Sequence, residues 1–196
     1  LLGGTAGRTT LNGEGLQHQD GHSHILASTV PSMLSFDPAF GFELAMIVRD
    51  GMYRMYEVQE DIFYYITLYN ENYPMPSLSD VLVSSGQTED EVNAGVLAGG
   101  YCIERAAGDA DIHLLASGSI MQQALEAKSI LEAQGFAVSL WSITSFVELQ
   151  RDALAAAASN RQDPVGQTRI SKLEAMFADA SGAIIAVTDY MASLAQ

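Results

Sequence analysis

The sequence predicts an α/β fold in which part of one domain is followed by a second domain with a parallel sheet. Beyond residue 96, short apolar runs alternate with stretches of helical periodicity, which is typical of parallel strands covered by helices. Before residue 70, one amphipathic helical stretch precedes one strand-like run. The composition, 48% hydrophobic and 17% charged, indicates a globular chain and not a disordered one.

The first predicted helix begins at Asp37 and Pro38. Aspartate is a favoured N-cap residue, and proline suits the first helical position because its missing N–H has no partner to lose there. The apolar residues of this helix lie at helical spacing: Phe40, Leu44, Ile47, Val48, Met52 and Met55.

After the helix, a strand is predicted. The run "IFYYITLY", residues 62–69, is β-branched and aromatic throughout and predicts a buried strand.

Residues 71–95 interrupt this pattern with two prolines, many small polar residues and an acidic run. Such a composition is typical of a linker. We therefore predict three parts: the later part of one α/β domain at 1–70, a linker at 71–95, and an incomplete second α/β domain at 96–196.

The second domain is predicted to contain a parallel sheet covered on both faces. "IHLLAS", "AVSLWSI" and "GAIIAVTD" are the expected strands, at 112–117, 137–143 and 182–189. A helix from Ile120 is expected to stop at Gly135, because glycine favours helix ends. Two further helices are expected at 146–158 and 169–180, with a loop between them.

Charge and composition exclude several classes of partner. A net charge of −15 with only nine Lys and Arg residues argues against nucleic acid, because binding phosphates requires clustered cations. No apolar run reaches ~18 residues and no signal-peptide pattern opens the chain, so we expect a cytoplasmic protein that spans no membrane. The single Cys102 lies between Tyr101 and Ile103, which predicts a buried side chain and not a nucleophile.

Both ends suggest a segment of a longer protein. The chain opens without methionine, and Thr188 or Asp189 is placed to cap a helix that has barely begun at Gln196. We therefore expect further folded structure before and after it.

Three of the four histidines lie in one stretch, "LNGEGLQHQDGHSH", residues 11–24. His18 and His22 have the i,i+4 spacing of zinc ligands on a helix, and Glu14 lies four residues before His18. However, the glycines break any helix here and no cysteine partner is near, so we predict no protein-bound metal in this segment.

Two other interpretations of this stretch apply to different residues. A glycine-rich turn with polar caps for a following helix accounts for Ser23 and for at least one of His22 and His24. A site is favoured for Glu14 and His18, because they follow the strand-like "RTTL" and α/β folds bind ligands at the carboxyl ends of strands. A histidine beside a carboxylate can serve as an acid–base pair near neutral pH.

Several motifs resemble one family in the same order: "GRTTLNGEGLQHQDGHSH", "FDPAF", "YYITLYNENYPMP", "LLASGSI", "TSFVELQRD" and "TDYM". The chain resembles the pyruvate-decarboxylating components of bacterial homodimeric pyruvate dehydrogenase complexes, in the transketolase-like superfamily. The resemblance implies that 1–70 belongs to the middle, pyrimidine-binding domain and 96–196 to the carboxy-terminal domain. It also implies thiamine diphosphate and Mg²⁺, whose diphosphate and metal ligands would lie in a domain outside this segment.

The same resemblance assigns roles to residues and partners. His18 matches the active-site histidine that contacts the substrate-derived part of the thiamine adduct, and Glu14 matches the carboxylate beside it. Gln17, His22 and His24 belong to the motif and are candidate substrate-binding residues. The implied substrate is pyruvate, and the implied acetyl acceptor is the lipoyl domain of dihydrolipoyl acetyltransferase. The family forms homodimers.

Two alternatives remain open at this stage. One is a transketolase-like paralogue that acts on another 2-keto acid or on a ketose. The other is that the segment by itself is a non-catalytic assembly module, because it lacks the diphosphate-binding domain. In either interpretation we expect the isolated segment to be inactive.

Overall fold

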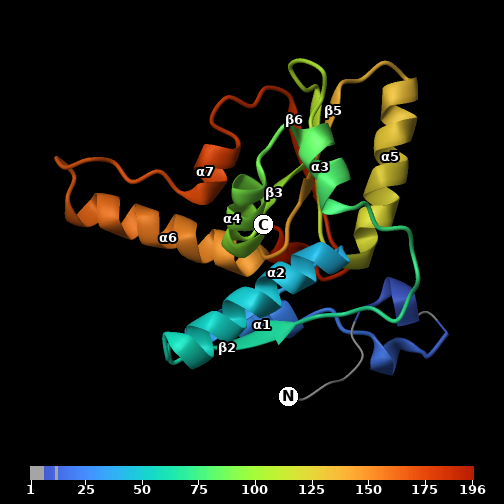
Figure 1. Cartoon of the computed structure of the whole chain (residues 1–196). Coiled ribbons are helices and arrows are strands. Elements are labelled where there is room, and N and C mark those ends of the chain that lie inside the picture. The colour runs from blue at the N-terminus through green and yellow to red at the C-terminus, as the bar shows by residue number, and fades with distance from the viewer. Residues whose placement is uncertain (1–6, 12) are drawn as a thin grey trace.

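The computed structural model describes residues 7–11 and 13–196 and folds them around two sheets. In the first sheet, β1 (Met33–Phe36) and β2 (Phe63–Ile66) are parallel and are joined through helix α2 (Gly41–Met52). The second sheet has the strand order β3-β5-β4-β6. Figure 1 shows α1 (Ser23–Ser28), α2 and β2 together below this second sheet. Helices packed on largely parallel strands confirm the predicted α/β class.

Helix α2 begins later than the sequence predicts. Asp37 is not its N-cap, because the Glu43 side chain accepts the amide hydrogens of Ala39 and Phe40 and the helix starts at Gly41. Only part of the predicted apolar stripe is buried: Val48 and Met52 are exposed. Strand β2 is half-buried and not buried as expected, since it pairs with β1 alone in a two-stranded sheet.

Two helices begin in the predicted linker, α3 (Leu78–Ser85) and α4 (Glu89–Ala98), and α4 extends three residues beyond it. Ser77 and Thr88 start them with capping boxes, in which the side chain three residues later bonds back to the cap. Ser77 and Thr88, two of the polar residues that suggest a linker, are thus helix caps. Inward-facing valines of both helices are buried, while the division into domains itself stays a prediction.

The three predicted strands of the second sheet are confirmed as β4 (Ile112–Ala116), β5 (Val138–Ser142) and β6 (Ala183–Val187), with β4 parallel to both neighbours. A fourth strand, β3 (Tyr101–Glu104), was not predicted and runs antiparallel to β5. Helix α5 (Met121–Ala133) lies on one side of the sheet, and α6 (Phe146–Gln162) and α7 (Lys172–Met176) lie on the other (Figure 1).

The ends of these elements differ from the prediction in three places. Helix α6 continues four residues beyond 158, to Gln162, and α7 covers only the centre of 169–180. Helices were predicted to cover both faces of the sheet, but they leave β6 uncovered: Ile184 and Ile185 are 52% and 44% exposed. Thr188 and Asp189 cap no α-helix; a short 3₁₀ turn, Ala192–Leu194, follows instead.

One apolar core joins the first sheet to the second. It extends from Phe36 and Ile47 to Tyr101, Leu114 and Leu140 without interruption. Cys102 is fully buried in a second cluster with Trp141 on the other face, which confirms the predicted buried side chain. This burial raises the pKa of its thiol to about 11. In the described part of the chain, no helix is long and apolar enough to cross a membrane.

Candidate active site

The segment that carries Glu14 and His18 is a closed loop and not a strand extension. The predicted strand "RTTL" is a 3₁₀ turn, Thr9–Leu11, and a second 3₁₀ turn spans Leu16–His18. Gly15 adopts φ 86° between them, a backbone conformation that glycine tolerates and other residues rarely adopt. The Asp20 amide donates to the Gly7 carbonyl at 3.1 Å, which closes the loop. We call the described residues between 7 and 21 the histidine loop.

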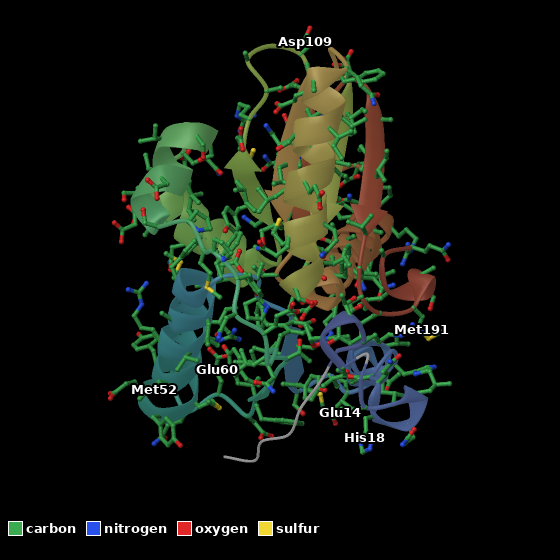
Figure 2. All side chains as sticks on the ribbon, turned by 90° about the vertical axis from the view of Figure 1, so that its right-hand side faces the viewer. Glu14, His18, Met52, Glu60, Asp109 and Met191 are labelled. Atoms are coloured by element: carbon green, nitrogen blue, oxygen red, sulfur yellow. The ribbon has the colours of Figure 1, made fainter. Side chains whose placement is uncertain are left out.

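Glu14 and His18 are both exposed on this loop, and Figure 2 shows them on the same edge of the molecule. Within residues 7–11 and 13–196, no hydrogen bond or ion pair joins their side chains. Gln17 is exposed beside them, with its amide folded back towards Gly15. The loop therefore brings the three predicted residues to one surface, where an imidazole, a carboxylate and an amide are available to a bound molecule.

The other two histidines of the motif have different environments. His22 is exposed at the N-cap position of α1, but its side chain caps nothing. Asp20 caps this helix instead: it accepts hydrogen bonds from the amides of His22 and Ser23 and from the Ser23 hydroxyl. Burial raises the pKa of Asp20, but these hydrogen bonds outweigh it, so the pKa lies below its ordinary value.

His24 lies on α1 and is buried, with 3% of its surface exposed. Its Nδ1 lies 2.5 Å from Ser35 Oγ and its Nε2 lies 3.0 Å from Thr67 Oγ1. Thr67 donates its own hydroxyl proton to Asp37, so it accepts from Nε2–H, and Nδ1 accepts from Ser35. Burial lowers the pKa of His24 and favours this neutral ring. In this chain His24 joins α1 to β1 and to the residue after β2, and its contact with substrate stays a prediction.

Asp37 continues this buried network towards the second sheet. Its Oδ1 accepts hydrogen bonds from Thr67 and, at 2.5 Å, from Tyr69, and its backbone bonds to Thr144 and Gly118. Sequence patterns missed this role because its partners lie about 30 residues away or further along the chain. The "DP" pair suggested a helix cap instead.

The described residues fit one part of a thiamine site and not another. Among the described residues, no group of three or more His, Cys, Asp or Glu side chains is arranged to hold a metal ion. The exposed Glu14 and His18 supply the donor and acceptor atoms needed for hydrogen bonding and proton transfer. They do not supply a diphosphate site, which requires backbone amides, cations or a metal.

A cleft of about 540 Å³ lies elsewhere, between α4, β5 and the α7 region. His113 lines it, but both of its ring nitrogens are engaged: Nε2 with the Ser181 carbonyl at 2.9 Å and Nδ1 with Trp141 Nε1 at 3.2 Å. Neither Glu14 nor His18 lines this cleft, so it is separate from the candidate site at the histidine loop.

Comparisons with known proteins show the family to which the chain belongs. The family model "Pyruvate dehydrogenase E1 component middle domain" matches residues 1–76, and "Transketolase-like TK C-terminal domain" matches 99–196. A "Pyruvate dehydrogenase E1 component" from Pseudomonas aeruginosa is 46% identical over 97% of the chain, and one from Escherichia coli is 43% identical over 100%. The chain spans only 21% of the length of each.

Solved transketolases share its fold. The enzyme from Campylobacter jejuni has a TM-score of 0.61 at 21% identity, over 97% of this chain and 24% of that one. A mutant transketolase from Pichia stipitis has a TM-score of 0.62 at 19% identity, over 93% and 22%. At such identities the similarity concerns the fold alone.

Proposed function

We propose a function from the premise that this chain belongs to the transketolase-like carboxy-terminal-domain family and has pyruvate dehydrogenase E1 components as its relatives. The chain is a segment of the acetyl-transferring pyruvate dehydrogenase. The whole enzyme decarboxylates pyruvate oxidatively and passes the acetyl group to lipoyl groups of dihydrolipoyl acetyltransferase. The similarity to E1 components along nearly the whole chain supports this proposal most directly.

The contribution of this segment is the histidine loop. His18 closes a 3₁₀ turn and exposes its imidazole, so Nδ1 or Nε2 can donate a hydrogen bond to a substrate oxygen or take up its proton. Glu14 presents a carboxylate from the same loop and can orient the ring or stabilise its protonated form. Gln17 and His22 border the same surface as candidate substrate contacts.

Thiamine diphosphate, when bound, supplies the carbanion chemistry by which a 2-keto acid loses carbon dioxide. The segment itself would face the reacting end of the cofactor, and other parts of the enzyme would hold the diphosphate and Mg²⁺. Assembly as a homodimer and a cytoplasmic location are further parts of this proposal.

The test uses the full-length enzyme with His18→Ala. One acid–base contribution is worth ~10²–10⁴-fold, so we expect acetyl transfer to lipoyl groups to fall by about that factor. Affinity for thiamine diphosphate, measured by calorimetry, should change little, because the diphosphate is held elsewhere. Gln19→Ala, a substitution on the same loop, is the control and should retain activity. Unchanged acetyl transfer in His18→Ala would refute the assignment of His18.

The rival reaction is separated by substrate choice. We expect the full-length enzyme to reduce lipoyl groups with pyruvate far faster than with longer 2-keto acids, and to leave ketose phosphates unchanged. Preference for a ketose donor would favour the transketolase-like paralogue instead.

A further inference from the structure

The segment after β6 holds the histidine loop from the opposite end of the chain. Asp189 is 8% exposed, and its carboxylate accepts hydrogen bonds from two residues of the loop. The Arg8 amide donates at 2.6 Å, the Thr9 amide at 3.0 Å, and the Thr9 hydroxyl at 2.5 Å. These residues are 180 or more positions apart in sequence, so the contact joins the first part of the chain to its last.

A second contact holds the other end of the loop. The Met191 amide donates to the Gly21 carbonyl at 3.1 Å, close to where Asp20 bonds back to Gly7. Asp189 and Met191 thus form hydrogen bonds with the histidine loop near its first and last residues. The stretch 13–18 between these contacts is exposed throughout, so its position depends on how its ends are held.

The residue between the two contacts is fixed to the buried network. Tyr190 is 4% exposed, its hydroxyl lies 3.3 Å from that of Tyr69, and its ring meets His24 edge-on at 4.7 Å between centroids. The segment 189–191 is therefore packed against the buried network through Tyr190. Hydrogen bonds to a charged acceptor are about twice as strong as neutral ones. The bonds that the Asp189 carboxylate accepts are therefore stronger than those of Tyr190 and Met191.

We propose that Asp189 is a positioning residue for the histidine loop: it sets the place of Glu14 and His18 through the backbone of Arg8 and Thr9. The link to catalysis rests on the proposed function, but the link to loop structure does not. Asp189 itself makes no contact with the side chains of Glu14 or His18 in the described residues. Its effect on the reaction must therefore pass through the loop.

The chemistry of the contact predicts a graded response. Asp189→Ala removes every acceptor. Asp189→Asn keeps one oxygen that can serve the two amides, and its NH₂ group can donate to the Thr9 hydroxyl, which is free to turn. Asparagine should therefore rescue most of the loop order that alanine loses.

The experiment compares both variants in the full-length enzyme with Asp109→Ala, an exposed carboxylate at the far end of the molecule (Figure 2). Hydrogen exchange of the peptide covering residues 8–21 reports the loop without requiring activity. We expect exchange about tenfold faster in Asp189→Ala, a smaller change in Asp189→Asn and none in Asp109→Ala. Unchanged exchange in Asp189→Ala would overturn the proposal.

Kinetics in a double-mutant cycle test the catalytic link. We expect Asp189→Ala to lower kcat for acetyl transfer about tenfold and to add little in a His18→Ala background. Equal losses in both backgrounds would show that Asp189 does not act through His18 and would overturn its positioning role. If His18→Ala alone keeps full activity while exchange still responds to Asp189→Ala, the proposed function fails and the structural contact stands.

Discussion

Glu43 is a buried carboxylate that joins α2 to the second sheet, and its removal should destabilise the chain strongly. It is fully buried and accepts four hydrogen bonds. Its Oε2 lies 2.6 Å from the Ala39 amide and 3.0 Å from the Phe40 amide. Its Oε1 lies 2.7 Å from Tyr101 OH and 2.6 Å from Ser142 Oγ. Tyr101 belongs to β3 and Ser142 to β5, so one side chain connects three elements.

The expected magnitude follows from these four donors. Glu43→Ala leaves two amides and two hydroxyls without an acceptor, and each unsatisfied buried group costs about 1–3 kcal/mol. Loss of a buried charge recovers part of this, so we expect the free energy of unfolding to fall by about 4 kcal/mol. Glu43→Gln keeps an oxygen for the amides, and the two hydroxyls can turn to accept from its NH₂ group. It should cost about 1 kcal/mol.

The contribution of Glu43 to the free energy of unfolding also depends on pH. Burial raises the pKa of Glu43, although hydrogen bonds from Ser142, Tyr101 and the two amides oppose the shift. In the unfolded chain, Glu43 releases its proton near its ordinary pKa of about 4.5. In the folded chain, it releases this proton only at a higher pH. The contribution of Glu43 to stability is present in full below that pH and declines as the pH rises through the folded pKa. Glu43→Gln should remove this decline.

Urea unfolding of the chain, followed by the fluorescence of its single tryptophan, Trp141, measures these differences. Trp141 pairs with Cys102 next to the Glu43 contacts and reports loss of the sheet. Glu126→Ala, an exposed change on α5, is the control and should alter stability by less than about 0.5 kcal/mol. A loss below about 1 kcal/mol in Glu43→Ala, or equal losses in the alanine and glutamine variants, would refute the reasoning.

Two further predictions concern the same joined architecture. Arg151 of α6 donates to the carbonyls of Met33 at 2.7 Å and Val30 at 2.8 Å, so Arg151→Ala should lower the free energy of unfolding by about 2 kcal/mol. Arg151→Lys should recover less than half, because an ammonium cannot span both carbonyls; full recovery in urea unfolding would contradict this. Burial lowers the pKa of His24, although the charges of Asp37 and Asp20 oppose this shift. As the pH falls below about 6.5, the histidine is therefore protonated in the unfolded chain before it is protonated in the folded chain. Below about pH 6.5, the free energy of unfolding should fall with pH in the native chain and not in His24→Gln. An equal slope in both chains would contradict this prediction.

Local patterns predicted most elements of the second domain well. The apolar runs of β4, β5 and β6 and the helix that ends before Gly135 follow from period and glycine placement alone. The same reasoning missed the helices that begin after Ser77 and Thr88, although each of these residues is followed three positions later by an acidic residue that completes a capping box. That signal was present in the sequence and could have located both helices.

The candidate site was predicted as far as local sequence allows. The motif with Glu14, Gln17 and His18 indicated a site, and the structure exposes all three on one loop. It did not indicate that His24, two residues after His22, turns inward to Ser35 and Thr67. Whether a histidine faces solvent or the core depends on the surface packed against it, which no neighbouring residue specifies.

The sequence by itself thus determined the α/β class and most strands and helices, because periodicity, caps and turn residues act over a few positions. Only the tertiary structure decided which polar side chains hold the parts together. Asp189 meets Arg8, and Glu43 meets Tyr101 and Ser142, across separations of 181, 58 and 99 residues. A carboxylate far from its donors in sequence has the same local pattern as a solvated one. Its role arises only when folding removes water from it and leaves specific amides and hydroxyls as its partners.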